Sequence, residues 1–242
     1  MHVLTASALL RVWDRGVGQS SVTQVLSLLA EAIPKTAVGE LARLPIGRRD
    51  ALLLALREQL FGSRVQTVVV CPQCRDSLDL VFEVDQIRVP LKSETQEEFV
   101  CDVDDYQVTF RLPTSEDLMM VVHKPEPGAA KQLLLERCLI RVMHRGETTT
   151  AFPSSLAEPV IERMAEADPQ GDVELAVTCA ACGYQWQALF DIASFVWREI
   201  GAWAKRLLGE VHLLASAYGW AEGDILRMSA WRRQCYLDMV QG

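Results

Sequence analysis

The chain has 242 residues, half of them hydrophobic and 23% charged, which is typical of a globular protein and excludes a disordered one. Its formal net charge of −8 gives it no overall attraction for a polyanion such as nucleic acid. The N-terminal stretch MHVLTASALLRVWDRG has no basic n-region and no long apolar run, so we expect no signal peptide, no membrane contact and a reducing, cytoplasmic location.

The first region, residues 1–64, has the pattern of helices. Ser20 and Ser21 precede a segment whose apolar residues recur every three or four positions and which stops at Pro34. LPIGRRDALLLALREQLFG then predicts a second helix, ending at Gly62. Its leucines are too dense for a surface helix, so we expect it in the core.

Two short regions, 65–85 and 173–191, share one pattern. In each, a Cys-x-x-Cys pair stands between segments whose apolar residues alternate with polar ones. Alternation of this kind predicts β-strands. Each pair is therefore expected at the tip of a β-hairpin; the four residues are Cys71, Cys74, Cys179 and Cys182.

Between the two hairpins, residues 86–172 read as an inserted α+β unit. FVCDV and YQVTFRL alternate and predict a further hairpin, and Thr114 with Asp117 resembles a capping box that opens a helix over SEDLMMVVH. Further helices are expected over 128–144 and 155–167. The segment has 9 basic and 16 acidic residues, a net charge of −7, which we interpret as a solvated acidic surface in preference to a site for a basic partner.

The last region, 192–242, is predicted to be a helical tail. A long amphipathic helix over 192–218 ends at Gly219, and two short helices follow, over 223–228 and 229–240. Five of the six tryptophans lie in the last 57 residues, and short helices fold poorly alone. Large side chains beyond Gly219 must then be buried by this chain or by a partner. We predict a partner-binding role for Trp220, Trp231, Tyr236 and Met239.

Three readings of the paired cysteines are open: a metal site, ordinary buried thiols, or a redox couple. A redox pair is expected at a helix N-terminus, and no helical pattern follows either pair. Two hairpin tips are instead typical of the halves of a four-cysteine zinc ribbon, which favours a structural Zn²⁺ ion despite the 104 residues between the pairs. Gly183 suits a positive φ, and Arg75 could offset the site's negative charge. Cys101, Cys138 and Cys235 are isolated and read as small buried hydrophobic residues.

The fold class that follows is α+β, mainly helical, with a split zinc-ribbon hairpin pair and an inserted α+β unit. We find no nucleotide loop, no HExxH and no GxSxG, so we expect no catalytic residue, no enzyme and no small-molecule substrate. Because many zinc ribbons bind nucleic acid, a nucleic-acid-binding regulator is the alternative function. The acidic residues around the cysteine pairs make it the weaker one.

Several stretches, in the same order, resemble one phage family. They are LLRVWDRG, LPIGRRDALLLALREQLFG followed by CPQC, FRLPTSEDL, and WREIGAWAKRLLGEVHLLASAYGW with DILRMSAWRRQCYLDMV. The family is that of the baseplate hub assembly chaperones and related baseplate proteins of T-even-type contractile-tailed phages, found also in prophages and phage-like injection systems. The resemblance implies a non-enzymatic assembly factor that binds hub or other tail proteins. Its place would be the cytoplasm of a bacterial or phage-infected cell, or the assembled baseplate.

Overall fold

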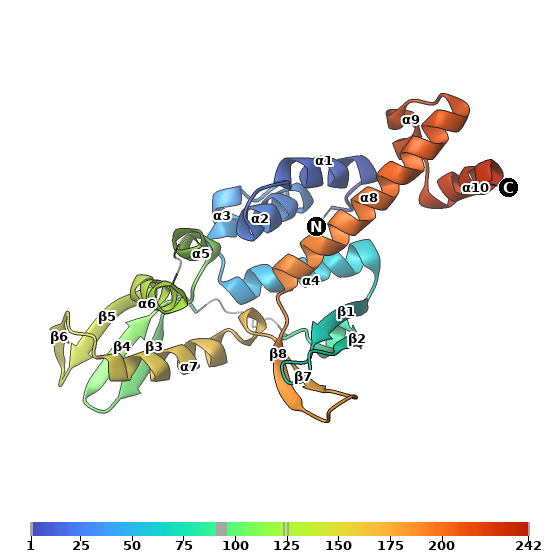
Figure 1. Ribbon diagram of the computed structural model, residues 1–242. Helices are drawn as coiled ribbons and strands as arrows, with labels where there is room; N and C mark the ends of the chain where they lie inside the picture. Colours follow the sequence, from blue (N-terminus) through green and yellow to red (C-terminus); the bar gives the residue numbers. More distant parts are fainter. Residues whose placement is uncertain (1, 91–95, 123, 125, 242) are drawn as a thin grey trace. The chain divides into compact units, whose positions relative to one another are not determined.

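The computed structural model describes residues 2–90, 96–122, 124 and 126–241. It combines helices with three small antiparallel sheets, so the α+β class predicted from the sequence is confirmed (Figure 1). Two compact units make up the chain: one joins the N-terminal residues up to Ala37 with those from Ala193 onward, and the other runs from Val38 to Ile192. The division of the chain into five regions stays a prediction.

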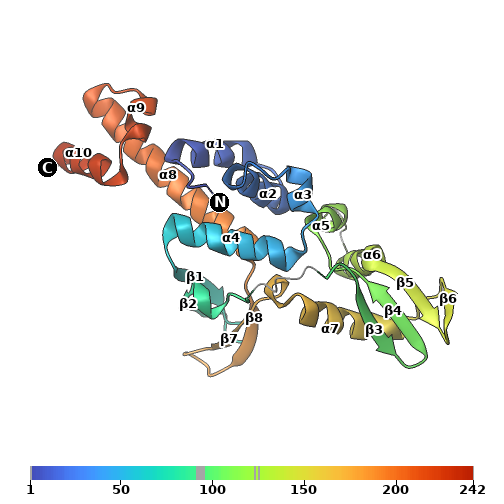
Figure 2. The same cartoon turned by 180° about the vertical axis from the view of Figure 1, so that it is seen from behind.

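The first unit is entirely helical. In it α1 lies beside α8, and Leu10 of α1 packs against Ala204 and Leu207 (Figure 1, Figure 2). The Ser20 side chain accepts a hydrogen bond from the Thr23 amide and so caps the start of α2. The helices of this unit are α1 Ala6–Gly16, α2 Ser21–Ala32, α8 Ile192–Tyr218, α9 Glu222–Arg227 and α10 Ala230–Gln241.

The tail folds back on the end of α8. Gly219 has φ +67° and ends that helix, as predicted. Ile225 of α9 and Leu237 of α10 then pack in one buried cluster with Val211 and Leu214 of α8. The two short helices are therefore held by the chain's own core.

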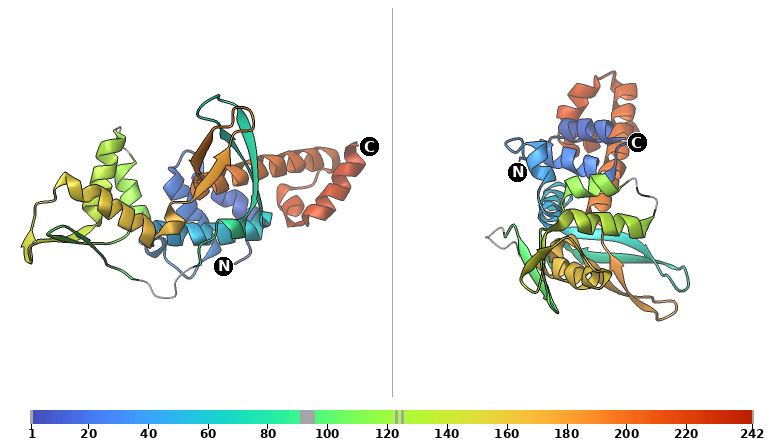
Figure 3. Two further views of the ribbon diagram at one scale, coloured as in Figure 1. Left: turned by 90° about the horizontal axis from the view of Figure 1, so that it is seen from below. Right: turned by 90° about the vertical axis from the view of Figure 1, so that its left-hand side faces the viewer.

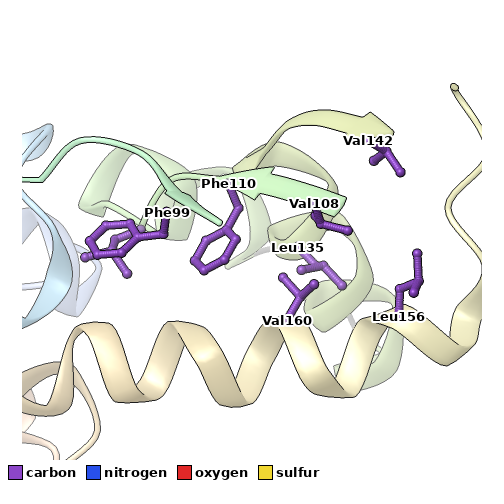
Figure 4. Close-up of a cluster of buried hydrophobic side chains, with 8 residues drawn as sticks. Phe99, Val108, Phe110, Leu135, Val142, Leu156 and Val160 are labelled. Atoms are coloured by element: carbon purple, nitrogen blue, oxygen red, sulfur yellow. The ribbon is translucent and has the colours of Figure 1, made fainter. Parts of the chain in front are cut away.

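The second unit contains a four-stranded antiparallel sheet and five helices among its described residues. The strand order is β3-β4-β5-β6, with β3 Phe99–Val103, β4 Tyr106–Phe110, β5 Leu139–His144 and β6 Glu147–Thr149. The helices are α3 Val38–Ala42, α4 Ile46–Phe61, α5 Ser115–Val121, α6 Pro127–Cys138 and α7 Ala157–Ala167. Figure 4 shows Val160 of α7 pointing toward Val108 and Phe110 of the sheet, in a cluster of buried side chains.

One predicted helix is wrong. The helix expected over 128–144 ends at Cys138, and the next six residues form β5, paired with β4. Leu139-Ile140-Arg141-Val142 contains β-branched residues that suit a strand, and Leu139 already has the extended backbone angles φ −70° and ψ 130°. Tertiary pairing with β4 therefore overrides the helical pattern that runs into this segment from α6. The end of the helix predicted over 115–123 falls outside the described residues, at His123.

The two cysteine-bearing hairpins are both present and lie side by side (Figure 3). The first pairs β1 Arg64–Val70 with β2 Ser77–Glu83, and the second pairs β7 Glu174–Thr178 with β8 Gln185–Leu189. The rings of Phe82 and Phe190 meet edge to face at 5.3 Å between centroids. Segments about 100 residues apart in the sequence are thus brought together.

Short 3₁₀ helices connect the hairpins to the inserted unit: η1 Val84–Gln86 and η3 Pro169–Gly171, with η2 Ser154–Leu156 before α7. Gln170, near the C-terminal end of the insert, is buried and bonds to its N-terminal end: its side chain accepts from the Val89 amide and donates to the Ile87 carbonyl. The Asp168 carboxylate accepts from the Gly47 amide at 2.8 Å, at the start of α4. These bonds hold the two ends of the insert together and join its C-terminal end to α4.

Candidate functional sites

The two cysteine turns, which we call the knuckles, have the same backbone hydrogen bonds. In the first, residues 71–76, the Cys71 amide donates to the Asp76 carbonyl and the Arg75 amide donates to the Cys71 carbonyl. In the second, residues 179–184, the Cys179 amide donates to the Tyr184 carbonyl and the Gly183 amide donates to the Cys179 carbonyl. One local structure therefore occurs twice in the chain.

The residue after the second cysteine has positive φ in both knuckles, +65° at Arg75 and +75° at Gly183. The prediction for Gly183 is confirmed. The equivalent conformation of Arg75 could not be foreseen from its residue type, since a non-glycine side chain rarely adopts it.

The four sulfur atoms converge. They lie within 4.8 Å of one another, with Cys71 Sγ 3.7 Å from Cys182 Sγ and Cys74 Sγ 3.6 Å from Cys179 Sγ. Four thiolates arranged tetrahedrally at ~2.3 Å from one ion would be about 3.8 Å apart. A disulfide would instead bring two sulfurs to about 2.05 Å. The four cysteines could hold a metal ion, as their sequence pattern suggested.

The pKa values of the two thiols of the first knuckle are shifted in opposite directions. Burial works against ionisation of Cys71, but hydrogen bonds from the amides of Cys74 and Gln73 bring its pKa down to about 7. At Cys74 the Asp76 amide lowers the pKa, whereas burial and the three neighbouring sulfurs raise it to about 12. The amides of the turn thus favour both thiolates, whereas burial and the crowded sulfurs oppose ionisation of Cys74. A bound cation would offset the repulsion among four thiolates.

No helix starts at either knuckle, because each pair is followed by a strand, β2 or β8. The geometry that lowers the pKa of a redox cysteine at a helix N-terminus is therefore absent from this described part of the chain. Of the three isolated cysteines, Cys138 is buried as predicted, while Cys101 and Cys235 are half-buried.

The tail residues predicted to bind a partner fall into two pairs. The Trp220 ring stacks on Tyr218 and meets Tyr236 edge to face at 4.9 Å, and both Trp220 and Tyr236 pack on the buried cluster of the tail. Trp231 and Met239 are instead 78% and 70% exposed. The first pair stabilises the tail, and the second pair is available at the surface.

Trp231 and Met239 share one stripe of α10. Positions i, i+4 and i+8 advance by only about 40° at each step around a helix, so Trp231, Cys235 and Met239 lie along one side. The buried Arg233 and Leu237 lie on the other side, where Arg233 donates to Glu210 at 2.9 Å. We call Trp231, Cys235 and Met239 the α10 stripe. The spacing was visible in the sequence, but the burial that separates it from Trp220 and Tyr236 was not.

Among the described residues, no helix is both long enough and apolar enough to cross a membrane.

Comparison with known proteins gives one match. A protein-family model described as "T4 bacteriophage base plate protein" matches residues 18–197. No curated protein and no solved structure matches the chain. The matched region contains both knuckles and ends within α8, so the α10 stripe lies beyond it.

Proposed function

The chain belongs to the T4-type phage baseplate protein family, and we propose that it is a non-enzymatic assembly factor or component of a baseplate hub. The family match over residues 18–197 carries this proposal. Such a factor acts by stoichiometric binding: it covers an apolar surface of an unassembled hub subunit until assembly displaces it. Its partners would be hub or other tail proteins.

The α10 stripe is the surface that we assign to partner binding. Trp231 and Met239 are, with Val3, the most exposed large apolar side chains among the described residues, and Trp is favoured at the centres of protein interfaces. Trp231 and Met239 stand on a helix that is anchored by Leu237 and Arg233. The stripe is therefore presented on a fixed support, which lowers the entropic cost of binding.

A structural Zn²⁺ ion held by the four cysteines completes the proposal. Zinc bound by four thiolates has no open coordination position, so it would supply folding energy and no catalysis. Cys71 and Cys74 would hold it from the first knuckle, and Cys179 and Cys182 from the second. The S–S separations of 3.6 and 3.7 Å support this assignment.

The test of the partner surface uses a double variant, Trp231→Ala with Met239→Ala, in cells that assemble the baseplate. We expect the tagged wild-type chain to co-purify with hub proteins, identified by mass spectrometry, and the double variant to lose at least about 90% of them, because removing one hot-spot residue commonly costs 2 kcal/mol or more. Asp238→Ala, an exposed change on the same helix, is the matched control and should bind normally.

Folding is checked in the same samples. Both substituted side chains are exposed, so the helical signal and the metal content should be unchanged. Capture of hub proteins at full strength by the double variant would place the interface elsewhere. Failure of the wild-type chain to capture any baseplate protein would contradict the assembly function itself.

A further inference from the structure

A pocket lies between α6 and α7 in the second unit, with a volume of about 210 Å³. Each helix lines it with apolar residues spaced three or four positions apart, a spacing that places them along one side of a helix. These residues are Leu134, Leu135 and Cys138 on α6, and Ile161, Met164 and Ala165 on α7.

The pocket has room for one large side chain. An apolar cavity of about 150 Å³ is enough to hold benzene. A pocket of about 210 Å³ therefore accommodates one phenyl or leucine side chain. Ala165 is exposed, so the pocket opens to solvent, and its apolar walls let such a side chain leave water without losing a hydrogen bond.

The two ends of the pocket differ in charge. At one end Lys131, early in α6, pairs with Glu158 at the start of α7, with Nζ and Oε2 3.3 Å apart. At the other end lie two carboxylates, that of Asp168, which directly follows α7, and that of Asp172. Neither of these two forms an ion pair with another described residue. One end is thus neutral and the other negative.

The cation nearest to this negative end is already matched. Arg49 acts on the Asp168 carboxylate, but it is buried and pairs with Asp50 at 2.7 Å. The Gly47 amide donates to Asp168 Oδ2 at 2.8 Å, and no other described residue donates to Oδ1. Asp168 and Asp172 therefore leave unmatched negative charge beside the apolar pocket.

We propose that this pocket binds a segment of a tail protein through one large apolar side chain that neighbours a lysine or an arginine. The apolar side chain would fill the space between α6 and α7, and the cation would lie at Asp168 and Asp172. One desolvated anchor side chain in a pocket supplies much of the affinity of a protein interface. The proposal rests on the assembly function for the identity of the partner, and it does not depend on the α10 stripe.

Charge favours such a partner over a second copy of this chain. Residues 86–172, which contain most of the pocket lining, have 9 basic and 16 acidic residues, a net charge of −7, and the whole chain has −8. Two copies that met at this face would bring like charges together, whereas a basic segment would be attracted. The acidity alone indicated only a solvated surface. The pocket adds an apolar site beside two of the carboxylates.

The experiment follows the methyl group of Met164, which lines the pocket, by NMR of the full-length chain labelled with ¹³C at its methionine methyl groups. Met164→Leu identifies the signal. We expect the end-blocked peptide Ser-Phe-Arg-Ser to shift it saturably, with a Kd on the order of 1 mM. Ser-Phe-Glu-Ser should bind at least about tenfold more weakly, and Ser-Ala-Arg-Ser should cause no shift.

Two variants test the two parts of the pocket. Ala165→Phe, at the exposed rim, fills the apolar space and should abolish peptide binding. Asp172→Asn should weaken Ser-Phe-Arg-Ser at least about threefold and reduce its advantage over Ser-Phe-Glu-Ser. Glu162→Gln, an exposed carboxylate of α7 outside the pocket, is the matched control and should change binding by less than about 1.5-fold.

The proposal is overturned if Ser-Phe-Arg-Ser does not saturate the wild type, if Ser-Phe-Glu-Ser binds equally well, or if folded Ala165→Phe binds unweakened. A wild-type dimer that Ala165→Phe converts to a monomer would also overturn it, because the occupant would then be a second copy. These results come from the purified chain, so they are separate from the co-purification that tests the assembly function. In that co-purification Ala165→Phe should lose at least about half of the captured hub protein, and undiminished capture would contradict a tail protein as the occupant.

Discussion

Arg75 and Gly183 occupy equivalent positions in the two knuckles, with φ of +65° and +75°. An L-residue in this conformation costs roughly 1 kcal/mol, a cost that glycine avoids. The first knuckle accepts it at an arginine because the turn that follows Cys71 places the Arg75 amide on the Cys71 carbonyl. The turn that brings the four sulfurs within 4.8 Å of one another therefore holds Arg75 at a positive φ, although an arginine prefers a negative φ.

The first residue-scale prediction is that Cys179→Ser removes the metal. The wild type should contain one zinc per chain by mass spectrometry, and the variant close to none, because three thiolates from two hairpins no longer close the site. Loss of a structural metal belongs to the few single changes that cost more than about 4 kcal/mol. For a chain of this size that lowers the thermal midpoint by roughly 10 °C.

Cys101→Ser is the matched control, because Cys101 is a half-buried thiol outside the cluster. Its zinc content should equal that of the wild type. A Cys179→Ser chain that keeps one zinc and its thermal midpoint would contradict the four-cysteine site.

At the scale of elements, Asp117 joins three of them. Its carboxylate accepts from Arg111 after β4, from Arg137 of α6, and from the Thr114 amide and hydroxyl at the start of α5. The capping box predicted from Thr114 and Asp117 is confirmed. The two arginine contacts, 6 and 20 residues away, could not be predicted because they depend on how the strand and helix pack.

We predict that Asp117→Asn destabilises the inserted unit by about 2 kcal/mol at pH 7. The carboxylate is 1% exposed, but both guanidinium groups are about a third exposed, which reduces the value of the pair. Burial alone would raise the pKa of Asp117, yet the bonds from Arg111 and Thr114 lower it to about 2. The folded-state pKa is therefore depressed, so this stabilisation is present above about pH 4 and is lost as the pH falls through 2.

Urea unfolding at several pH values measures the effect. The difference in the free energy of unfolding between wild type and Asp117→Asn should be about 2 kcal/mol at pH 7 and should shrink as the pH falls from 4 towards 2. Glu116→Gln changes the exposed neighbouring carboxylate, which pairs with Arg43 at the surface, and should cost little at any pH. A difference in unfolding free energy that does not depend on pH would show that Asp117 stabilises the unit through packing alone and not through its charge.

Elements with a strong repeating pattern were predictable from the sequence, and those fixed by distant pairing were not. The helix over 192–218, its end at Gly219 and both cysteine hairpins follow from residue spacing alone. β5 was missed because Leu139–His144 continues an apolar pattern from α6, and only pairing with β4 makes it a strand. Likewise the four cysteines were identified by their spacing, whereas the division of the tail aromatics into packed and exposed pairs depends on tertiary contacts.

At the scale of the whole molecule, the charge distribution bears on the alternative function. The formal net charge is −8. The first hairpin carries Arg64 and Arg75 but also Asp76, Asp79 and Glu83. A ribbon that binds nucleic acid needs a basic face, because neutralising phosphates releases counterions and supplies most of the non-specific affinity. This hairpin has more acidic than basic groups.

We therefore predict no binding of duplex DNA or single-stranded RNA tighter than about 1 µM at physiological salt. Fluorescence anisotropy with labelled nucleic acids, repeated at low and high salt, measures it. Replacing Asp76 and Asp79 by lysine adds 4 units of positive charge to the hairpin, from −1 to +3 over residues 64–83. That variant should gain weak nucleic-acid binding that falls steeply with salt. Such a gain would show that the wild-type hairpin does not bind nucleic acid because of its charge alone. Sub-micromolar affinity of the wild-type chain, with the same steep salt dependence, would contradict the prediction and favour a nucleic-acid-binding regulator over a baseplate assembly factor.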